Sequence, residues 1–334
     1  MNKPSVSIIV PVYNVAPFIE RCLKSVMSQT YTGKMECLII DDCGTDDSIV
    51  ISERMINEYN GDIRFQILHH KQNRGLSAAR NTGTNAAIGD YLFYLDSDDE
   101  LTVDCIEKLM KPVQNDPTIE MVMGSYNRFS DSYQLPPLQR ILQEKDIVSI
   151  EAVRDYYYER NVFPVAAWNK LIKKEFLVQH QLFFKEGLLF EDQLWIFYVV
   201  KYLSHLYTMP DITYLHYKRP HSITTGTGKE ERAFHYGMIY HEITNNLTVG
   251  DRREAKFYVR HFCSRCIKFS PIQSFRQASL PFKKTLLRNH YILEYILLSA
   301  TLFLSKFALG RSLFLFARKT RRVIRSLFKH LCFR

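Results

Sequence analysis

The first 125 residues alternate short apolar runs with stretches in which apolar residues recur three and four positions apart. The runs are typical of buried strands, and the wider spacing is typical of amphipathic helices. The predicted strands span 6–12, 35–40, 63–68, 91–95 and 120–126, and the predicted helices span 18–29, 47–59, 75–89 and 103–113. This alternation predicts an α/β fold, a Rossmann-like and mostly parallel sheet flanked by helices, with ligands bound beyond the carboxyl ends of its strands.

An acidic segment follows the fourth predicted strand directly. Residues 96–100 read Asp-Ser-Asp-Asp-Glu, and they come straight after the apolar run 91–95. Carboxylates this close repel one another, so a positive partner is expected, and Mg²⁺ or Mn²⁺ prefers such oxygen ligands. The alternative is a turn that caps a helix beginning near Thr102, since acids are favoured at a helix start. The spacing alone does not separate the two interpretations.

Glycine loops that cradle phosphates are missing from the sequence. No GxGxxG follows the first predicted strand, which ends in PVYN, and no GxxxxGK[ST] occurs anywhere. These patterns mark dinucleotide-binding and P-loop proteins. If a nucleotide binds, the sequence therefore predicts that a metal holds its phosphates.

Composition and charge place the chain among globular proteins with a basic tail. Of its 334 residues, 46% are hydrophobic and 24% charged, and the formal net charge is +9. The seven scattered cysteines form no disulfide framework, and the start of the chain runs into a strand-like segment with no signal peptide. We therefore expect a cytoplasmic protein with reduced thiols.

The basic excess lies in residues 281–334, which hold twelve Lys or Arg and one acid. Within this tail, 292–309 is short for a membrane-spanning helix and carries two charges. Residues 311–331 place apolar and basic side chains on different sides of a helix, the pattern of a helix at a membrane interface. A nucleic-acid arm is the competing interpretation, but it needs no wide apolar face; a helix that contacts a partner protein is the other alternative.

Four segments in order carry a resemblance to a known family. They are VSIIVPVYN (6–14), the pair Asp41-Asp42, NRGLSAARNTG (73–83) and GDYLFYLDSDD (89–99). Together they resemble the family 2 glycosyltransferases, an inverting group with a GT-A nucleotide-sugar-binding fold, here of the bacterial surface-polysaccharide type. Segments 166–177, 188–199 and 214–224 also resemble the later part of that family, and beyond about residue 225 the resemblance fades.

The resemblance implies a division of the chain into three parts. Residues 1–225 would form the GT-A domain, with 1–110 as the nucleotide-sugar-binding half and 111–225 as the acceptor half. Residues 226–280 would form a helical extension, and 281–334 the basic amphipathic tail that associates with a membrane.

The resemblance also implies roles for individual residues on the donor side. The expected donor-binding residues are Pro11, Val12, Tyr13, Asn14, Asp42, Gly75, Arg80, Asp96 and Ser97. Asp42 would accept a hydrogen bond from the base. Alternatively, Pro11 and Asn14 shape a turn, and Arg80 only pairs with Asp41.

A divalent cation, Mn²⁺ or Mg²⁺, is the implied cofactor. Asp96 and Asp98 form the DxD pair of the family, with Asp98 on the metal and Asp99 as a less certain second ligand. His216 is a candidate third ligand, although the family commonly shows an aromatic residue near this point, and a half-exposed strand histidine is the alternative. The loop after it offers three possible phosphate partners, Lys218, Arg219 and Ser222.

An inverting transfer also needs a general base, because the acceptor hydroxyl loses a proton as it attacks the anomeric carbon. Asp192 in FEDQLW matches the family's ED motif and is the expected base, with Glu191 positioning or contacting the acceptor. An ordinary helix N-terminus is the alternative for both acids. Trp168 and Lys170 could help to form the acceptor pocket, although an indole is more often in the core.

The resemblance and the tail together predict the function. We expect an enzyme that moves a hexose or hexosamine from a nucleoside-diphosphate sugar, UDP-linked by preference, to a saccharide or polyprenyl-linked acceptor in surface polysaccharide assembly. It would act at the cytoplasmic face of the inner membrane and bind no nucleic acid. The rival of another class is a non-catalytic module that binds a nucleotide sugar or a membrane.

Overall fold

The computed structural model describes residues 3–129, 138–160, 164–219, 222, 226–248 and 250–269, with a few single positions beyond. The chain divides into two compact units, Met1–Gly226 and Thr227–Arg334. Each unit is described by itself below.

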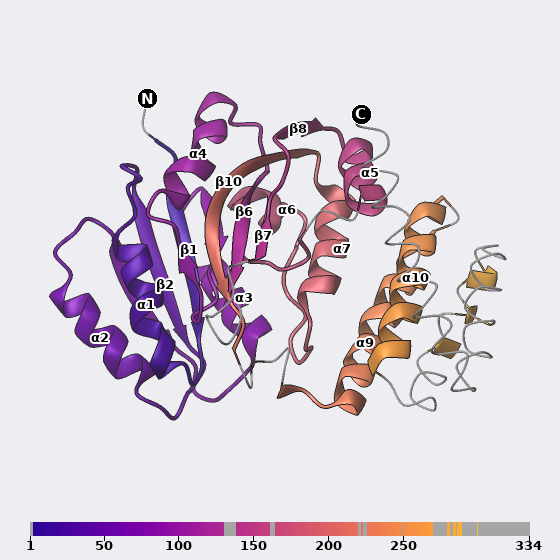
Figure 1. The fold of residues 1–334 in the computed structure, drawn as a ribbon, viewed down its shortest axis with the longest axis horizontal. Coiled ribbons are helices and arrows are strands. Elements are labelled where there is room, and N and C mark those ends of the chain that lie inside the picture. Colours follow the sequence, from indigo (N-terminus) through magenta and orange to yellow (C-terminus); the bar gives the residue numbers. More distant parts are fainter. Residues whose placement is uncertain are drawn as a thin grey trace. The chain divides into compact units, whose positions relative to one another are not determined.

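The first unit is built on one ten-stranded sheet (Figure 1). Its strand order is β3-β2-β1-β4-β9-β6-β10-β5, with β7 beside β6 and β8 beside β10. The strands are β1 (Val6–Val12), β2 (Met35–Asp41), β3 (Arg64–His69), β4 (Tyr91–Tyr94), β5 (Glu100–Leu101), β6 (Met121–Phe129), β7 (Leu138–Arg140), β8 (Lys145–Val148), β9 (Lys170–Lys173) and β10 (His205–Tyr217).

Helices connect these strands in the first half of the unit and flank the sheet throughout. They are α1 (Ala16–Met27), α2 (Ser48–Glu58), α3 (Leu76–Ala86), α4 (Cys105–Asn115), α5 (Ile150–Arg160), α6 (Lys174–Gln179) and α7 (Asp192–Tyr202). All nine elements predicted within the first 125 residues are present, with ends shifted by at most three residues. The apolar periodicity was therefore a sufficient guide to this half.

The sheet was predicted to be mostly parallel. The structure confirms this arrangement only for the first half of the sheet. Strands β3, β2, β1 and β4 pair in parallel, as crossover helices require. Beyond β4 the sheet is mixed, because β9 lies antiparallel to both β4 and β6, and β10 pairs antiparallel with β5 and β8. The strand β9 is far in sequence from both of its neighbours, since β4 ends at Tyr94 and β6 at Phe129.

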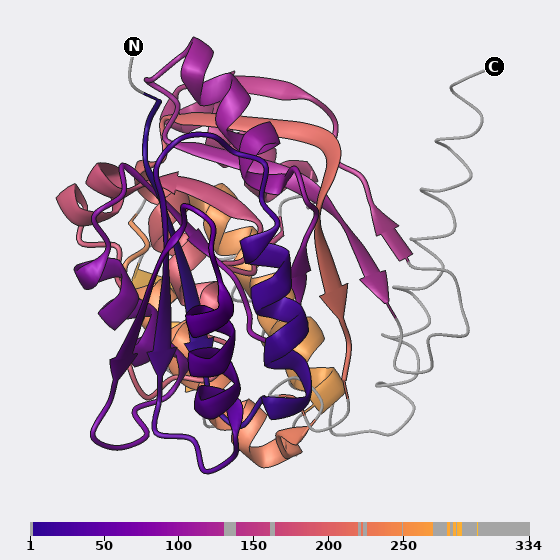
Figure 2. The ribbon, with the colours of Figure 1, turned by 90° about the vertical axis from the view of Figure 1, so that its left-hand side faces the viewer.

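Both faces of β1 are covered, which explains why every residue of the strand is buried and all but Ser7 are apolar. Alternate residues Val6, Ile8, Val10 and Val12 join the core that includes α1 and α4 side chains. Ile9 points to the other face, where a Cβ on Gly83 of α3 would lie 2.4 Å from its side chain. Glycine at this position lets α3 approach the sheet closely. The unit is therefore a layered α/β structure (Figure 2).

The second unit contains two described helices, α9 (Lys229–Asn245) and α10 (Arg252–Phe269). They pack through aromatic contacts, since the ring of Tyr240 meets those of Tyr258 and Phe262 at centroid distances of 6.3 and 5.1 Å. Among the described residues, no helix is both long and apolar enough to cross a membrane. The predicted membrane-associating tail, 281–334, lies almost wholly outside the described residues, so its role stays a prediction.

Candidate active site

Most of the predicted donor-binding residues lie where β1, β2 and β4 end, at the same edge of the sheet, while Gly75 and Arg80 belong to the start and the interior of α3. Pro11 and Val12 are buried at the end of β1, and Tyr13 just beyond is 48% exposed. Asn14 has a positive φ of 51° and accepts a hydrogen bond from the amide of Thr45 at 2.7 Å. Asn14 therefore joins the loops after β1 and β2, and Tyr13 is the exposed ring at this edge.

Asp42 is buried, with 3% of its surface exposed. Its Oδ1 accepts hydrogen bonds from the amide of Arg74 at 2.8 Å and contacts His70 Nδ1 at 2.6 Å, and its Oδ2 accepts from the amide of Gly75 at 2.7 Å. Gly75 has a φ of +84°, which glycine adopts without strain. Asp42 thus holds the turn that leads into α3, and its predicted contact with a base stays a prediction.

The acidic segment forms a turn between β4 and β5, closed by a hydrogen bond from the Asp99 amide to the Asp96 carbonyl. The strand β5 follows, and α4 begins only at Cys105, after Asp104. The interpretation of residues 96–99 as a helix cap is therefore wrong, because a strand separates them from the helix. Ser97 is buried within the turn.

Asp98 lies between two arginines. Its Oδ2 pairs with Arg219 Nε at 2.5 Å, and its carbonyl accepts from Arg21 Nη2 at 2.8 Å. The Arg21 guanidinium also pairs with Glu100 at 3.0 Å and lies 3.8 Å from the centre of the Tyr217 ring. Neither the ion pair nor this stacking was predicted, since Arg21 carries no signal beyond its place in an amphipathic helix.

Asp99 is fully buried, and burial raises its pKa to about 6, while its contact with His216 opposes the shift. It accepts hydrogen bonds from the Tyr214 hydroxyl at 2.8 Å, from His216 Nδ1 at 3.1 Å and from the Tyr217 amide at 2.7 Å. Burial opposes the charged form of His216, but the contact with Asp99 outweighs it and raises the pKa of His216. Tyr214 was missed, although its spacing of two from His216 in a strand places both side chains on one face.

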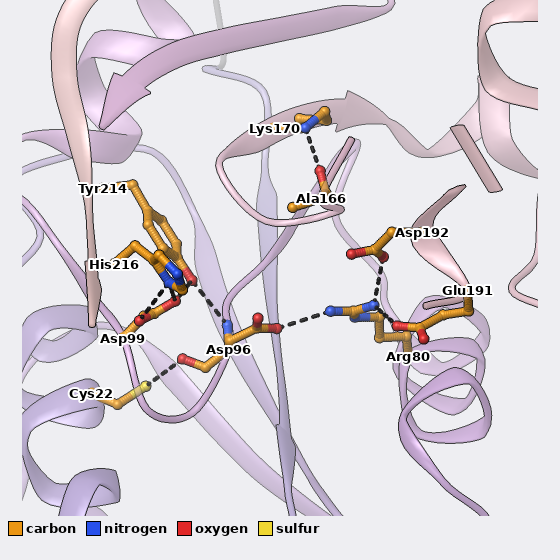
Figure 3. Close-up of polar contacts among 10 residues, drawn as sticks. All are labelled: Cys22, Arg80, Asp96, Asp99, Ala166, Lys170, Glu191, Asp192, Tyr214 and His216. Carbon is orange, nitrogen blue, oxygen red and sulfur yellow. Dashed lines mark hydrogen bonds and ion pairs between the residues drawn. The ribbon is translucent and has the colours of Figure 1, made fainter. Parts of the chain in front are cut away.

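Arg80 joins the two halves of the site (Figure 3). The side chain comes from α3 and is 1% exposed. Its Nη2 pairs with Asp96 Oδ1 at 2.9 Å, and its Nη1 pairs with Glu191 at 2.7 Å and with Asp192 at 2.9 Å. Burial disfavours the charge on Arg80, but the three acids outweigh burial and raise its pKa. Asp41 contacts His69 instead, so the alternative pairing of Arg80 with Asp41 is wrong.

Glu191 and Asp192 differ in accessibility. The side chain of Glu191 is 4% exposed, whereas that of Asp192 is 21% exposed. Burial, reinforced by the charge of Asp192, raises the pKa of Glu191 to about 7. Asp192 is the first residue of α7, yet neither acid caps the helix through its side chain; both turn to Arg80. Because Asp192 is the more exposed of the two acids, it is the one that a second substrate could reach.

Two buried residues lie close to the site, Trp168 just before β9 and Lys170 as the first residue of β9. Trp168 is 8% exposed and stacks on the rings of Tyr214 and His216 at 4.6 and 5.2 Å. Its burial favours a packing role over a place in the acceptor pocket. The Lys170 ammonium is fully buried and donates to the Ala166 carbonyl (Figure 3). Burial lowers the pKa of Lys170 to about 7, against the opposing charge of Asp192.

This pKa predicts a measurable pH dependence. An unfolded lysine titrates near 10.5, so between pH 7 and 10 the unfolded chain holds a proton that folded Lys170 has lost. The free energy of unfolding therefore rises with pH, by about 2 kcal/mol between pH 7 and 9 from this group. In Lys170→Met that contribution is absent. Urea unfolding of both proteins at the two pH values measures it, and an equal pH dependence in both would contradict the burial of a titrating amine.

The turn offers ligands that fit a hard divalent cation. Oxygens of Asp96, Asp98 and Asp99 lie within 4.8 Å of one another. Asp99 accepts hydrogen bonds from Tyr214, His216 and Tyr217, whereas Asp96 and Asp98 each bind an arginine through one oxygen only, as far as the described residues show. Mg²⁺ and Mn²⁺ sites of this kind use one or two carboxylates, with water and substrate phosphates as further ligands.

Comparison with known proteins decides the family. The profile described as "Glycosyl transferase family 2" matches residues 7–179, just over half of the chain. The chain belongs to this family. One relative is the uncharacterized glycosyltransferase EpsJ of Bacillus subtilis (strain 168), which is 30% identical to this chain over 226 residues. The match covers 66% of this chain and 63% of EpsJ, so the chain spans less than two thirds of that relative.

Solved structures confirm the GT-A fold of this family 2 chain. S. aureus TarS 1-349 in complex with UDP-GlcNAc superposes with a TM-score of 0.62 at 20% identity, over 90% of each chain. The mannosyltransferase PcManGT from Pyrobaculum calidifontis, in complex with GDP-Man and Mn2+, superposes with a TM-score of 0.50 at 18% identity. It covers 97% of this chain and 81% of PcManGT.

Proposed function

We propose that the chain is a metal-dependent inverting glycosyltransferase that moves a hexose or hexosamine from a nucleoside-diphosphate sugar to a saccharide hydroxyl. The observation that carries the proposal is the contact of one buried guanidinium with both Asp96 and Asp192. An in-line displacement requires the donor site and the base to be no farther apart than about one sugar ring. Arg80 meets this requirement because its guanidinium contacts an acid of each.

The donor would lie over the edge formed by β1, β2 and β4. Tyr13 offers an exposed ring against which a base could stack. TarS in its complex holds UDP-GlcNAc, which supports a UDP-linked donor for a chain of the same fold. Asp96 and Asp98 would hold the cation, which when bound would neutralise charge on the departing diphosphate.

The chain's own residues would perform the proton transfer. The acceptor oxygen forms a bond to the anomeric carbon from the face opposite the nucleotide, and the bond from that carbon to the diphosphate oxygen breaks. The diphosphate leaves with the electron pair, and Asp192 takes the proton of the acceptor hydroxyl. Arg80 orients Asp192 for this step, since buried Glu191 binds the same Nη1 as Asp192 and Asp96 binds Nη2.

The proposed acceptor and the proposed cellular setting are inferred from the family and from the basic C-terminal tail. A saccharide on a polyprenyl carrier, in surface polysaccharide assembly, would suit a chain whose basic amphipathic segment 311–331 lies at the cytoplasmic face of the inner membrane. Nucleic acid is not among the proposed partners, because the sequence of that segment predicts a wide apolar side.

Donor turnover tests the proposed function. The purified chain is incubated with Mn²⁺ and each of a panel of UDP- and GDP-sugars, and release of the nucleoside diphosphate is measured. We expect slow hydrolysis of one UDP-sugar that chelation of the metal abolishes. No release from any donor, together with no binding of UDP, would contradict the proposal.

The ion pair of Arg219 with Asp98 predicts competition with the cation. Because a guanidinium already occupies one oxygen of Asp98, removing it should strengthen Mn²⁺ binding to the nucleotide-free chain. A partly exposed pair is worth about 1 kcal/mol, so Arg219→Met should bind Mn²⁺ about fivefold more tightly. Titration of free Mn²⁺ by electron paramagnetic resonance measures this. Arg54→Met, which removes the same charge from an exposed pair with Glu20, is the matched control and should change nothing.

A further inference from the structure

We propose that Asn81 is a positioning residue for the base Asp192, and that its carboxamide joins the donor-side helix α3 to the segment that leads into α7. The inference rests on the proposed function, which it deepens by naming a residue on which the rate of transfer depends and donor binding does not.

The carboxamide of Asn81 pairs with the backbone of Phe184 through two hydrogen bonds. Its Nδ2 donates to the Phe184 carbonyl at 2.8 Å, and its Oδ1 accepts from the Phe184 amide at 2.8 Å. Phe184 lies between α6 and α7, outside any helix or strand, so its backbone groups depend on such a partner. One side chain of α3 therefore satisfies both polar backbone groups of a residue 103 positions away, and we call this pair of bonds the Asn81 clasp.

Phe184 carries this connection to the start of α7. Its ring stacks on that of Trp195, with a centroid distance of 4.8 Å and an interplanar angle of 16°. The indole of Trp195 donates to the Leu182 carbonyl at 3.0 Å, and its backbone amide donates to the Glu191 carbonyl at 2.9 Å. Trp195 is thus bound both to the clasped segment and to the first turn of α7. The position of that turn, which carries Asp192, follows the position of Phe184.

Arg80 and Asn81 are adjacent residues of α3 and hold this region in different ways. Arg80 binds the carboxylate of Asp192 at 2.9 Å, and its guanidinium lies 5.1 Å from the centre of the Phe184 ring. Because the same guanidinium binds Asp96, a movement of α7 would either break its contact with Asp192 or draw it away from Asp96. The ion pair therefore directs the carboxylate, and the Asn81 clasp keeps the backbone that bears it in place.

Replacing Asn81 by alanine removes both bonds of the clasp. The full chain is incubated with Mn²⁺ and the UDP-sugar that it hydrolyses, with water in place of the acceptor hydroxyl, and release of UDP is measured. We expect kcat to fall about 10- to 100-fold, since a misplacement of about 1 Å costs up to about 10²-fold. KM for the donor, and the affinity for UDP with Mn²⁺ by calorimetry, should stay within about threefold of wild type.

Two further variants support the comparison. Asn81→Gln keeps the carboxamide on a longer side chain, so its kcat should lie between those of wild type and Asn81→Ala; it also serves as the test variant if Asn81→Ala does not fold. Asn85 is exposed on α3, four residues further along. Asn85→Ala makes the same chemical change without touching the clasp, and it should leave kcat, KM and UDP affinity unchanged.

Fluorine resonance of the chain labelled with 5-fluorotryptophan reports the position of α7 independently of activity. The chain has two tryptophans, and Trp168→Phe assigns their signals. In Asn81→Ala we expect the signal of Trp195 to shift or broaden, because its stacking partner Phe184 has lost the clasp. The signal of Trp168, which stacks on Tyr214 instead, should stay in place.

The combined results decide the inference. An unchanged kcat or an unchanged Trp195 signal in Asn81→Ala would overturn it. Equal losses of kcat and of UDP affinity would overturn it as well, because they would indicate a general loss of structure. No UDP release and no UDP binding by the wild-type chain would instead contradict the proposed function, and the Trp195 signal alone would then decide whether Asn81 holds α7.

Discussion

Replacing Asp192 by asparagine is expected to lower the rate of sugar transfer about 10²- to 10⁴-fold, the range that a general base contributes. Asparagine keeps the size of the side chain and can still lie beside Arg80, but it cannot accept the proton of the acceptor hydroxyl. Donor affinity should stay within about threefold of wild type, because Asp192 lies on the far side of Arg80 from Asp96. Transfer by product analysis and UDP binding by calorimetry measure the two quantities.

A nearby acid provides the control for this substitution. Glu186 precedes Asp192 by six residues, is 46% exposed and pairs at the surface with Arg74. Glu186→Gln removes the same charge and should leave transfer unchanged. Equal rates in Asp192→Asn and wild type would remove the proposed base and favour a chain that binds a nucleotide sugar without catalysis.

Replacing Arg80 by methionine is expected to lower the free energy of unfolding by about 3–5 kcal/mol at neutral pH, since it leaves buried charge without a partner. Three carboxylates, those of Asp96, Glu191 and Asp192, would then face one another around an apolar side chain. Urea unfolding without divalent cation measures the loss.

The matched replacement is Arg80→Lys, which keeps the charge but cannot reach three acids with a planar fork. We expect its stability to lie between those of wild type and Arg80→Met. Its transfer rate should fall more than its donor affinity, because the orientation of Asp192 depends on the fork. If the free energy of unfolding of Arg80→Met lies within 1 kcal/mol of the wild-type value, the three acids do not depend on this guanidinium for stability.

The first half of the fold could be predicted because its information is local. The strands β1, β2 and β4 are short, mostly apolar runs, β3 alternates apolar and polar residues, and the helices that follow them space apolar residues three and four apart. The second half could not, since β9 inserts antiparallel between β4 and β6, and that pairing joins residues far apart in the chain. No periodicity within residues 170–173 specifies such partners.

The candidate site also has a part that the sequence could predict and a part that it could not. Asp96, Asp98 and Asp192 stand out in the sequence because acids beside apolar runs are unusual, and the family resemblance names them. The contacts that organise these acids come from elsewhere: Tyr214 and His216 reach Asp99 only through the pairing of β10 with β5. The run of acids alone does not reveal that Asp99 accepts hydrogen bonds from Tyr214, His216 and Tyr217, and its role as a second ligand stays a prediction.

We propose that Arg80 joins the cation site, through Asp96, to the base, Asp192. Crystals of the chain grown with Mn²⁺ and UDP test it most directly, because Mn²⁺ is located by its anomalous scattering. The account predicts an anomalous peak bonded to Asp98 and to the diphosphate, with Arg80 still joining Asp96 to Asp192. A peak away from the 96–99 turn, or UDP bound on a surface that does not face Asp192, would contradict it.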